Sequence, residues 1–201
     1  MIADALLVAG AYLVGSIPFG VVLVRLARGE DIRAQGSGNI GASNVWRTYG
    51  RSLGLPVALL DVLKGLVPAL AALWLGGESV AVLAGAAAMV GHARPVWLGF
   101  QRGGKMVATA GGVSLALAPI VAVVCVGVWL ATFALFRYAS LASLVTAVAL
   151  PVLSVAFGEP WQTIAFGIAA CVGVFTLHRH NILRLVRGTE PRFSRSPAAR
   201  A

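Results

Sequence analysis

The chain has 201 residues, of which 59% are hydrophobic and 11% are charged, and its mean hydropathy is +0.88. A soluble globular protein carries roughly 25% charged residues, so this composition excludes a soluble domain and indicates an integral membrane protein. In a soluble chain the net charge of +9 would suggest binding to nucleic acid. In a membrane protein such charge orients the chain, so we expect the lipid bilayer, and no nucleic acid, as a partner.

Six apolar stretches are comparable with the roughly 20 residues that a helix needs to cross the hydrocarbon core of a bilayer. Each is expected to be helical, because backbone groups in lipid must be hydrogen-bonded within their own segment. The fourth stretch, 106–136, has 31 residues, which is too many for one upright span. Pro119 marks the point where we expect two short helices to meet. The stretches are 5–24, 54–75, 79–98, 106–136, 139–157 and 161–177.

The distribution of basic residues predicts the topology. Fourteen of the sixteen Lys and Arg residues lie in 25–51, in 94–105 and from 179 onward, and the positive-inside rule places such segments in the cytoplasm. The expected fold is an all-α polytopic membrane protein with seven transmembrane helices, an external N-terminus and a cytoplasmic C-terminus. Residues 1–193 are predicted to form a single transmembrane domain, and the polar tail at 194–201 is predicted to be disordered.

The first basic loop is rich in glycine, hydroxyl and amide residues. It matches the pattern GxGxxG, but a transmembrane segment precedes it where a dinucleotide-binding fold requires a strand, so we reject that fold. Glycines still allow backbone N–H groups to approach an oxyanion, and an arginine can form two parallel hydrogen bonds to a phosphate group. A flexible polar loop with a helix cap is the alternative. The candidate residues are Gly36, Ser37, Gly38, Asn39, Gly41, Ser43, Asn44 and Arg47.

The second basic loop carries Gly103, Gly104 and Lys105 directly before a predicted helix that includes Thr109. The complete phosphate-loop pattern is absent, because Met106 follows the lysine. A glycine turn, a lysine and a helix N-terminus together still suit an anion. The alternative is a lysine that serves only as a topology signal at a helix end.

The third basic segment contains His178, Asn181 and Arg184. His178 and Asn181 are three residues apart and therefore share a helix face, whereas Arg184 lies on a neighbouring face. Two histidines and an asparagine are too few for a metal site, so no metal is expected. The three basic segments lie on one side of the membrane, and each suits phosphate.

Three further ionisable residues fall inside or at the end of predicted spans. Asp61 and Lys64 lie three residues apart on one helix face and can form an ion pair, which either stabilises the span or borders the site. His92 closes the third span on the cytoplasmic side, where it either hydrogen-bonds into the site or caps a helix.

Taken together, these motifs resemble the PlsY family, bacterial membrane acyltransferases that transfer an acyl group from acyl-phosphate to glycerol 3-phosphate. The resemblance covers about residues 12–193. Two differences lie in the second loop, where one extra residue separates Phe100 from Gly103 and Met106 replaces a glycine. The matching motifs are Ser16-Ile17-Pro18-Phe19-Gly20, residues 36–44 with Arg47, Asp61-x-x-Lys64-Gly65, Gly91-His92-x-x-Pro95, Gly103-Gly104-Lys105-x-Val107-Ala108-Thr109, His178-Arg179-x-Asn181-Ile182-x-Arg184-Leu185 and Gly188-Thr189-Glu190.

The resemblance implies a site at the cytoplasmic face of the bacterial plasma (inner) membrane. There the 1-hydroxyl of glycerol 3-phosphate attacks the acyl-phosphate, giving lysophosphatidic acid and phosphate in phospholipid biosynthesis, with no cofactor and no coenzyme A. The implied catalytic residues are Ser37, Arg47, Lys105, His178 and Asn181. The expected substrate- and phosphate-binding residues are Gly36, Gly38, Asn39, Gly41, Ser43, Asn44, His92, Gly103, Gly104, Thr109 and Arg184.

Two points stay open at this stage. The general base is either His178 or a phosphate oxygen of the substrate, and we expect His178 to orient glycerol 3-phosphate without acting as the base. The competing function is a small anion or organophosphate transporter, since glycine-rich loops and half-length helices also occur at carrier binding sites. No inverted repeat is visible in the spans, and the basic residues cluster on one face, which argues against a carrier.

Overall fold

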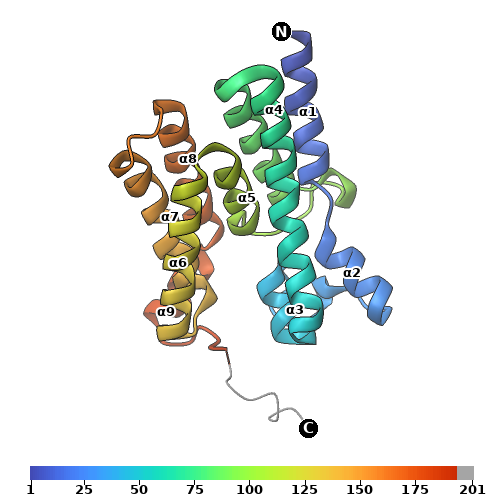
Figure 1. The fold of residues 1–201 in the computed structure, drawn as a ribbon. Helices are drawn as coiled ribbons and strands as arrows, with labels where there is room; N and C mark the ends of the chain where they lie inside the picture. The colour runs from blue at the N-terminus through green and yellow to red at the C-terminus, as the bar shows by residue number, and fades with distance from the viewer. Residues whose placement is uncertain (194–201) are drawn as a thin grey trace.

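We describe the protein from a computed structural model, which defines residues 1–193. These residues form helices and no strands, as the all-α prediction requires; the tail predicted at 194–201 lies outside them. In chain order the elements are α1 (Ile2–Gly15), α2 (Phe19–Arg28), η1 (Ile32–Ala34), α3 (Ala42–Tyr49), α4 (Arg51–Ala93), η2 (Val96–Leu98), α5 (Val107–Leu117), α6 (Pro119–Phe136), α7 (Ala139–Ala156), α8 (Trp161–Leu177) and α9 (Arg179–Val186) (Figure 1).

Several of these helices are long and apolar enough to cross a membrane. Within residues 1–193, four helical stretches meet that requirement, and a fifth does if α8 and α9, which meet at 64°, are counted as one broken span. The protein therefore has the helices of a multi-pass membrane protein. The number of seven spans and the orientation of the termini stay predictions.

The first predicted span, 5–24, is not one helix. Helix α1 ends at Gly15 and α2 begins at Phe19, because Pro18 lacks the N–H that a continuous helix would need. Figure 1 shows α2 leaving the axis of α1 at an angle. The break releases the carbonyl of Ile17 from helical hydrogen bonding, and this carbonyl accepts a hydrogen bond from Lys64 Nζ at 2.9 Å.

Helix α4 is a hairpin, as the separate predictions at 54–75 and 79–98 indicate. Gly77 has φ +79° and ψ −177°, a non-helical conformation that glycine adopts readily. Helix α4 turns back on itself near the end of the molecule where the N-terminus lies (Figure 1). As a result Asp61 Oδ1 lies 3.6 Å from His92 Nδ1, whereas 31 residues of straight helix would separate them by about 46 Å.

The long apolar run at 106–136 is broken at the predicted place. Helix α5 ends at Leu117 and α6 begins at Pro119, with Ala118 in a non-helical conformation between them. Proline suits the first turn of a helix, where its missing N–H has no partner to lose. Only α5, with 11 residues, is as short as expected; α6 has 18 residues and is long enough to span.

Small residues let α1 pack closely against both arms of α4. Ala11, Ala72 and Ala84 are buried in one cluster with other alanines, and a Cβ added at Gly15 would lie 2.2 Å from the Ala88 carbonyl oxygen. Such small-residue contacts are the usual means of close helix packing in membranes. Helix α5 then joins α4 to α6, and α3 and α9 lie at the end of the bundle opposite the N-terminus (Figure 1).

Candidate functional site

The first basic loop is held in shape by Asn44. This side chain is 3% exposed; its Oδ1 accepts a hydrogen bond from the Ser37 N–H at 2.9 Å, and its Nδ2 donates to the carbonyls of Gln35 and Asn39 at 3.0 and 2.9 Å. Gly36 has φ +57°, and a Cβ there would lie 2.5 Å from Asn44 Oδ1. The Asn44 side chain thus supports the loop from inside.

The exposed part of this loop consists of Gly36, Ser37 and Gly38, and Ser43 is exposed at the start of α3. Gly41 caps α3 and donates its N–H to Asn39 Oδ1 at 2.9 Å. Hydroxyl groups and backbone N–H groups next to a helix N-terminus suit an anionic ligand. Arg47, one turn further along α3, is half-buried.

The second basic loop packs against the C-terminal end of α4, to which it is hydrogen-bonded. Gly103 and Gly104 donate their N–H groups to the carbonyls of Ala93 and His92 at 3.0 and 2.9 Å. A Cβ at Gly103 would lie 2.1 Å from the His92 carbonyl oxygen, so only glycine fits there. Asn39 Nδ2 donates to the Gly103 carbonyl at 3.0 Å and joins the first loop to the second.

Lys105 connects the second loop to α9. Its Nζ donates a 2.6 Å hydrogen bond to Asn181 Oδ1. Burial, together with the positive charges of Arg184, Arg47 and Arg102, lowers the pKa of Lys105 to about 8, while the carboxylate of Glu190 opposes the shift. Cations from α3, the second loop and α9 are therefore close enough to act on one another.

Met106 occupies the position at which the PlsY pattern has glycine. Its φ of +69° lies in the left-handed region that glycine prefers. Helix α5 begins directly after it, at Val107.

Thr109, a predicted binding residue, is fully buried where α5 packs against α4. A Cβ added at Gly65 of α4 would lie 2.2 Å from the Thr109 carbonyl oxygen. Thr109 therefore contributes to the contact between these two helices.

His178 and Asn181 lie at the bend between α8 and α9, and they are 3% and 4% exposed. His178 Nδ1 lies 2.8 Å from the Val174 carbonyl oxygen. A carbonyl can only accept, so Nδ1 carries the proton and a neutral His178 presents the lone pair of Nε2. Asn181 Oδ1 accepts from Lys105, while its Nδ2 donates to Glu190 Oε1 at 2.7 Å.

Glu190 is a central residue that the predicted site set omitted. Its carboxylate accepts hydrogen bonds from Ser140 Oγ, Asn181 Nδ2 and Arg184 Nε, each at 2.7 Å. Burial alone would raise the pKa of Glu190, but these hydrogen bonds hold it below its ordinary value. The motif Gly188-Thr189-Glu190 was a signal for this residue, whereas nothing local pointed to Ser140.

Phe193 is a second residue that the sequence did not single out. Its N–H donates to the Arg137 carbonyl at 2.9 Å, and its own carbonyl accepts from Arg137 Nε at 2.8 Å. The ring packs edge-on against Trp46 of α3 and Phe133 of α6, and the Arg47 guanidinium lies 5.5 Å from the ring centroid. The segment after α9 thereby connects α6 to α3 beside Arg47.

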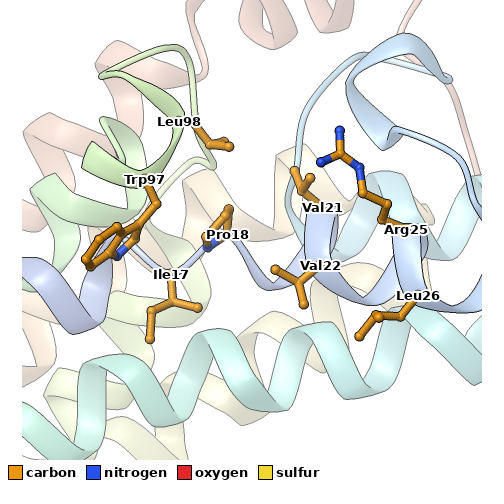
Figure 2. Close-up of a pocket in the computed structure, with 8 residues that line it drawn as sticks. All are labelled: Ile17, Pro18, Val21, Val22, Arg25, Leu26, Trp97 and Leu98. Atoms are coloured by element: carbon orange, nitrogen blue, oxygen red, sulfur yellow. The ribbon is translucent and has the colours of Figure 1, made fainter.

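A groove of about 520 Å³ lies elsewhere, at the α1–α2 break. Figure 2 shows its lining: Trp97 and Leu98 lie on one side, Ile17 and Pro18 lie in the middle, and Val21, Val22, Arg25 and Leu26 lie on α2 at the other side. It is mostly apolar, and Arg25 in its lining pairs with Asp31 at 3.1 Å. The lining residues within the described part of the chain include none of the predicted site residues. Within residues 1–193, no group of three or more His, Cys, Asp or Glu side chains could hold a metal ion.

The chain is similar in sequence to proteins of one family. Residues 5–188 match the family model described as glycerol-3-phosphate acyltransferase. Relatives named glycerol-3-phosphate acyltransferase include those of Desulforudis audaxviator, 43% identical over 96% of this chain and 97% of the relative, and of Paramagnetospirillum magneticum, 49% identical over 91% and 90%.

Two solved structures also match over 96% of both chains. They are crystal structures of PlsY, an integral membrane glycerol 3-phosphate acyltransferase, in its glycerol 3-phosphate form (TM-score 0.92, 42% identity) and its lysophosphatidic acid form (TM-score 0.89, 41% identity). The resemblance drawn from the motifs is therefore confirmed: the chain belongs to the glycerol-3-phosphate acyltransferase family and has the PlsY fold.

Proposed function

We propose that the protein transfers an acyl group from acyl-phosphate to the 1-hydroxyl of glycerol 3-phosphate. The observation that carries this proposal is the Lys105–Asn181 hydrogen bond, which joins two distant basic segments beside Arg47 and Arg184. Both proposed substrates carry phosphate, and several cations around one site can bind two phosphate groups. The lysophosphatidic acid and glycerol 3-phosphate forms of the PlsY relative support the same acceptor and product.

In the proposed reaction the acceptor oxygen forms a bond to the acyl carbon, and the bond from that carbon to the phosphate oxygen breaks. The departing phosphate takes up the proton released by the hydroxyl. Acyl-phosphate is an activated anhydride, so orientation of the hydroxyl and stabilisation of the leaving phosphate supply much of the rate. We assign the stabilisation to Arg47 and Lys105.

We assign roles to other predicted residues from their positions in the structure. His178 Nε2 orients the acceptor without acting as the base, and Asn181 holds Lys105. Ser37 and Ser43, with Gly36, Gly38 and Gly41, bind phosphate at the start of α3. Asn39, Asn44, Gly103 and Gly104 shape the two loops, and Arg184 adds a cation. This chemistry requires neither a cofactor nor coenzyme A.

The donor is tested directly with purified protein, acyl-phosphate and radiolabelled glycerol 3-phosphate. We expect lysophosphatidic acid to form without coenzyme A, and acyl-CoA to give no product in its place. Product from acyl-CoA alone would contradict the proposed donor. Absence of product together with uptake of glycerol 3-phosphate into proteoliposomes would support a transporter.

The pH dependence of the reaction should report on Lys105. The protonated amine is the form that stabilises phosphate, and the pKa of Lys105 is about 8, so activity should fall as the pH rises through about 8. Lys105→Arg should move this fall to higher pH, because a guanidinium stays charged. His178→Asn is the control and should keep the alkaline fall; an unchanged profile in Lys105→Arg would contradict the assignment.

We also propose that the single domain 1–193 lies in the bacterial plasma (inner) membrane, with the N-terminus outside and the C-terminus and site on the cytoplasmic side. The supporting observation is the clustering of basic residues in three segments. Alkaline phosphatase fused to the C-terminus should be inactive, because it folds only outside the cytoplasm. Strong phosphatase activity of that fusion would reverse the topology.

A further inference from the structure

Three ionisable side chains form a buried cluster that the proposed reaction does not use. Asp61, Lys64 and His92 are 2%, 3% and 3% exposed. Lys64 Nζ lies 2.7 Å from Asp61 Oδ1, and His92 Nδ1 lies 3.6 Å from the same oxygen. Burial of ionisable groups inside a membrane protein costs free energy, so their presence indicates a functional role.

The cluster lies where three segments meet. Asp61 and Lys64 come from the first arm of the α4 hairpin, and His92 comes from the end of its second arm. Lys64 also donates to the Ile17 carbonyl at the α1–α2 break, at 2.9 Å, and its Nζ lies 5.6 Å from the centroid of the Phe19 ring. The hydrogen bond from Lys64 to Ile17 therefore joins the α1–α2 break to the first arm, and Asp61 lies beside His92 across the hairpin.

His92 also lies directly beneath the loop that carries Lys105. Its carbonyl accepts the Gly104 N–H at 2.9 Å. Its ring fills the space next to the same residue, because a Cβ added at Gly104 would lie 1.9 Å from Nε2 and 2.3 Å from Cε1. The imidazole and the second loop therefore fit together only while residue 104 is glycine.

The contacts of the His92 side chain favour positioning over hydrogen bonding. Its Nδ1 is buried and has no hydrogen-bond partner within residues 1–193; the distance of 3.6 Å to Asp61 is too long for a hydrogen bond. The ring is thus held by close packing, with the Asp61–Lys64 pair next to it. Lys105, the next residue after Gly104, must in turn reach Asn181 Oδ1 at 2.6 Å.

We propose that His92 is a positioning residue for Lys105: its ring, set by the Asp61–Lys64 pair, supports Gly104 and thereby holds the Lys105 amine against Asn181. This inference rests on the proposed function, since it assigns a support to the cation of that site. It also changes the sequence-based assignment of His92, from a residue that binds substrate to one that acts through the loop.

A cluster that only stabilised helix packing would make a different prediction. In that case a methyl group at residue 104 and a truncation at residue 92 would each impair the protein, and their effects would add. If His92 acts through its contact with Gly104, removal of the ring makes room for the methyl group, and the two changes compensate. The double variant therefore separates the two explanations.

The experiment compares Gly104→Ala, His92→Ala and the double variant, with Gly111→Ala as the control. Gly111 lies in α5, and a Cβ there would meet nothing within 4 Å. We expect Gly104→Ala to lower kcat/KM for glycerol 3-phosphate by at least tenfold and His92→Ala to lower it less. The double variant should be more active than Gly104→Ala, and Gly111→Ala should match the wild type. Effects that multiply in the double variant would overturn the inference.

A second measurement does not depend on the acyl donor. The rate at which an amine-reactive reagent modifies Lys105 in isolated membranes, followed by mass spectrometry, should rise in Gly104→Ala and return toward the wild-type rate in the double variant. Equal rates in all variants would overturn the inference even if the enzyme is active. Inactivity of the wild type with acyl-phosphate would instead contradict the proposed function alone. If His92→Ala does not accumulate, His92→Ser makes the same comparison.

Discussion

Replacement of Lys105 by methionine is expected to lower kcat by about 10²- to 10³-fold, the effect of removing one group that stabilises developing negative charge. Methionine has nearly the length of the lysine side chain but carries no charge, so the leaving phosphate would lose one of its two proposed cations. The Asn181 oxygen would also lose its 2.6 Å partner. Steady-state formation of lysophosphatidic acid from acyl-phosphate measures the change.

The matched control for this variant is Arg102→Gln, which removes an exposed positive charge three residues earlier in the same loop. Long-range attraction of the substrate should weaken only slightly in the control, because exposed charges are screened by salt. Similar losses in the two variants would mean that net charge, and not the position of the Lys105 amine, governs the rate.

Replacement of Glu190 by alanine should destabilise the protein by about 3 kcal/mol, since each buried donor left without an acceptor costs about 1–3 kcal/mol. Two buried side chains, Ser140 and Asn181, lose their acceptor at once, and the partly exposed Arg184 loses its ion pair. The unfolding midpoint of the solubilised protein should fall by roughly 6–12 °C on this basis. Thermal unfolding followed by light scattering or fluorescence measures it.

The two controls for Glu190 separate charge from hydrogen bonding. Glu190→Gln keeps one oxygen acceptor and should lose less stability than Glu190→Ala. Glu159→Ala removes a carboxylate beyond the opposite end of α7 and should change the midpoint by no more than about 1–2 °C, as is usual for a substitution away from a buried network. A midpoint for Glu190→Ala equal to that of Glu159→Ala would show that the network does not support the fold.

Much of the helical framework could be predicted because it depends on neighbours along the chain. The length of each apolar run determines where a helix can cross a bilayer, and Pro119 breaks the longest run at the expected place. The kink after Gly15 was missed, although Pro18 is its local cause. The apolar run continues on both sides of that proline, and hydropathy alone does not register a break.

The site was only partly predictable. Glycines, hydroxyls and cations in three basic loops led us to predict that these segments bind phosphate, and Lys105 and Asn181 do lie together. The same composition could not distinguish exposed Ser37 from Asn44, which is buried beneath the loop. Both residue types occur in the same glycine-rich stretch, and their exposure depends on how that stretch folds back onto α3.

By itself, the sequence determined that this is a helical membrane protein of the PlsY type with three basic segments, because composition, run length and motif spacing are local properties of the chain. Only the tertiary structure decided which groups meet. The hairpin at Gly77 brings His92 to Asp61, and Glu190 reaches Ser140 across 50 positions. Those contacts depend on how whole helices pack against one another, and their packing is a property of the complete fold.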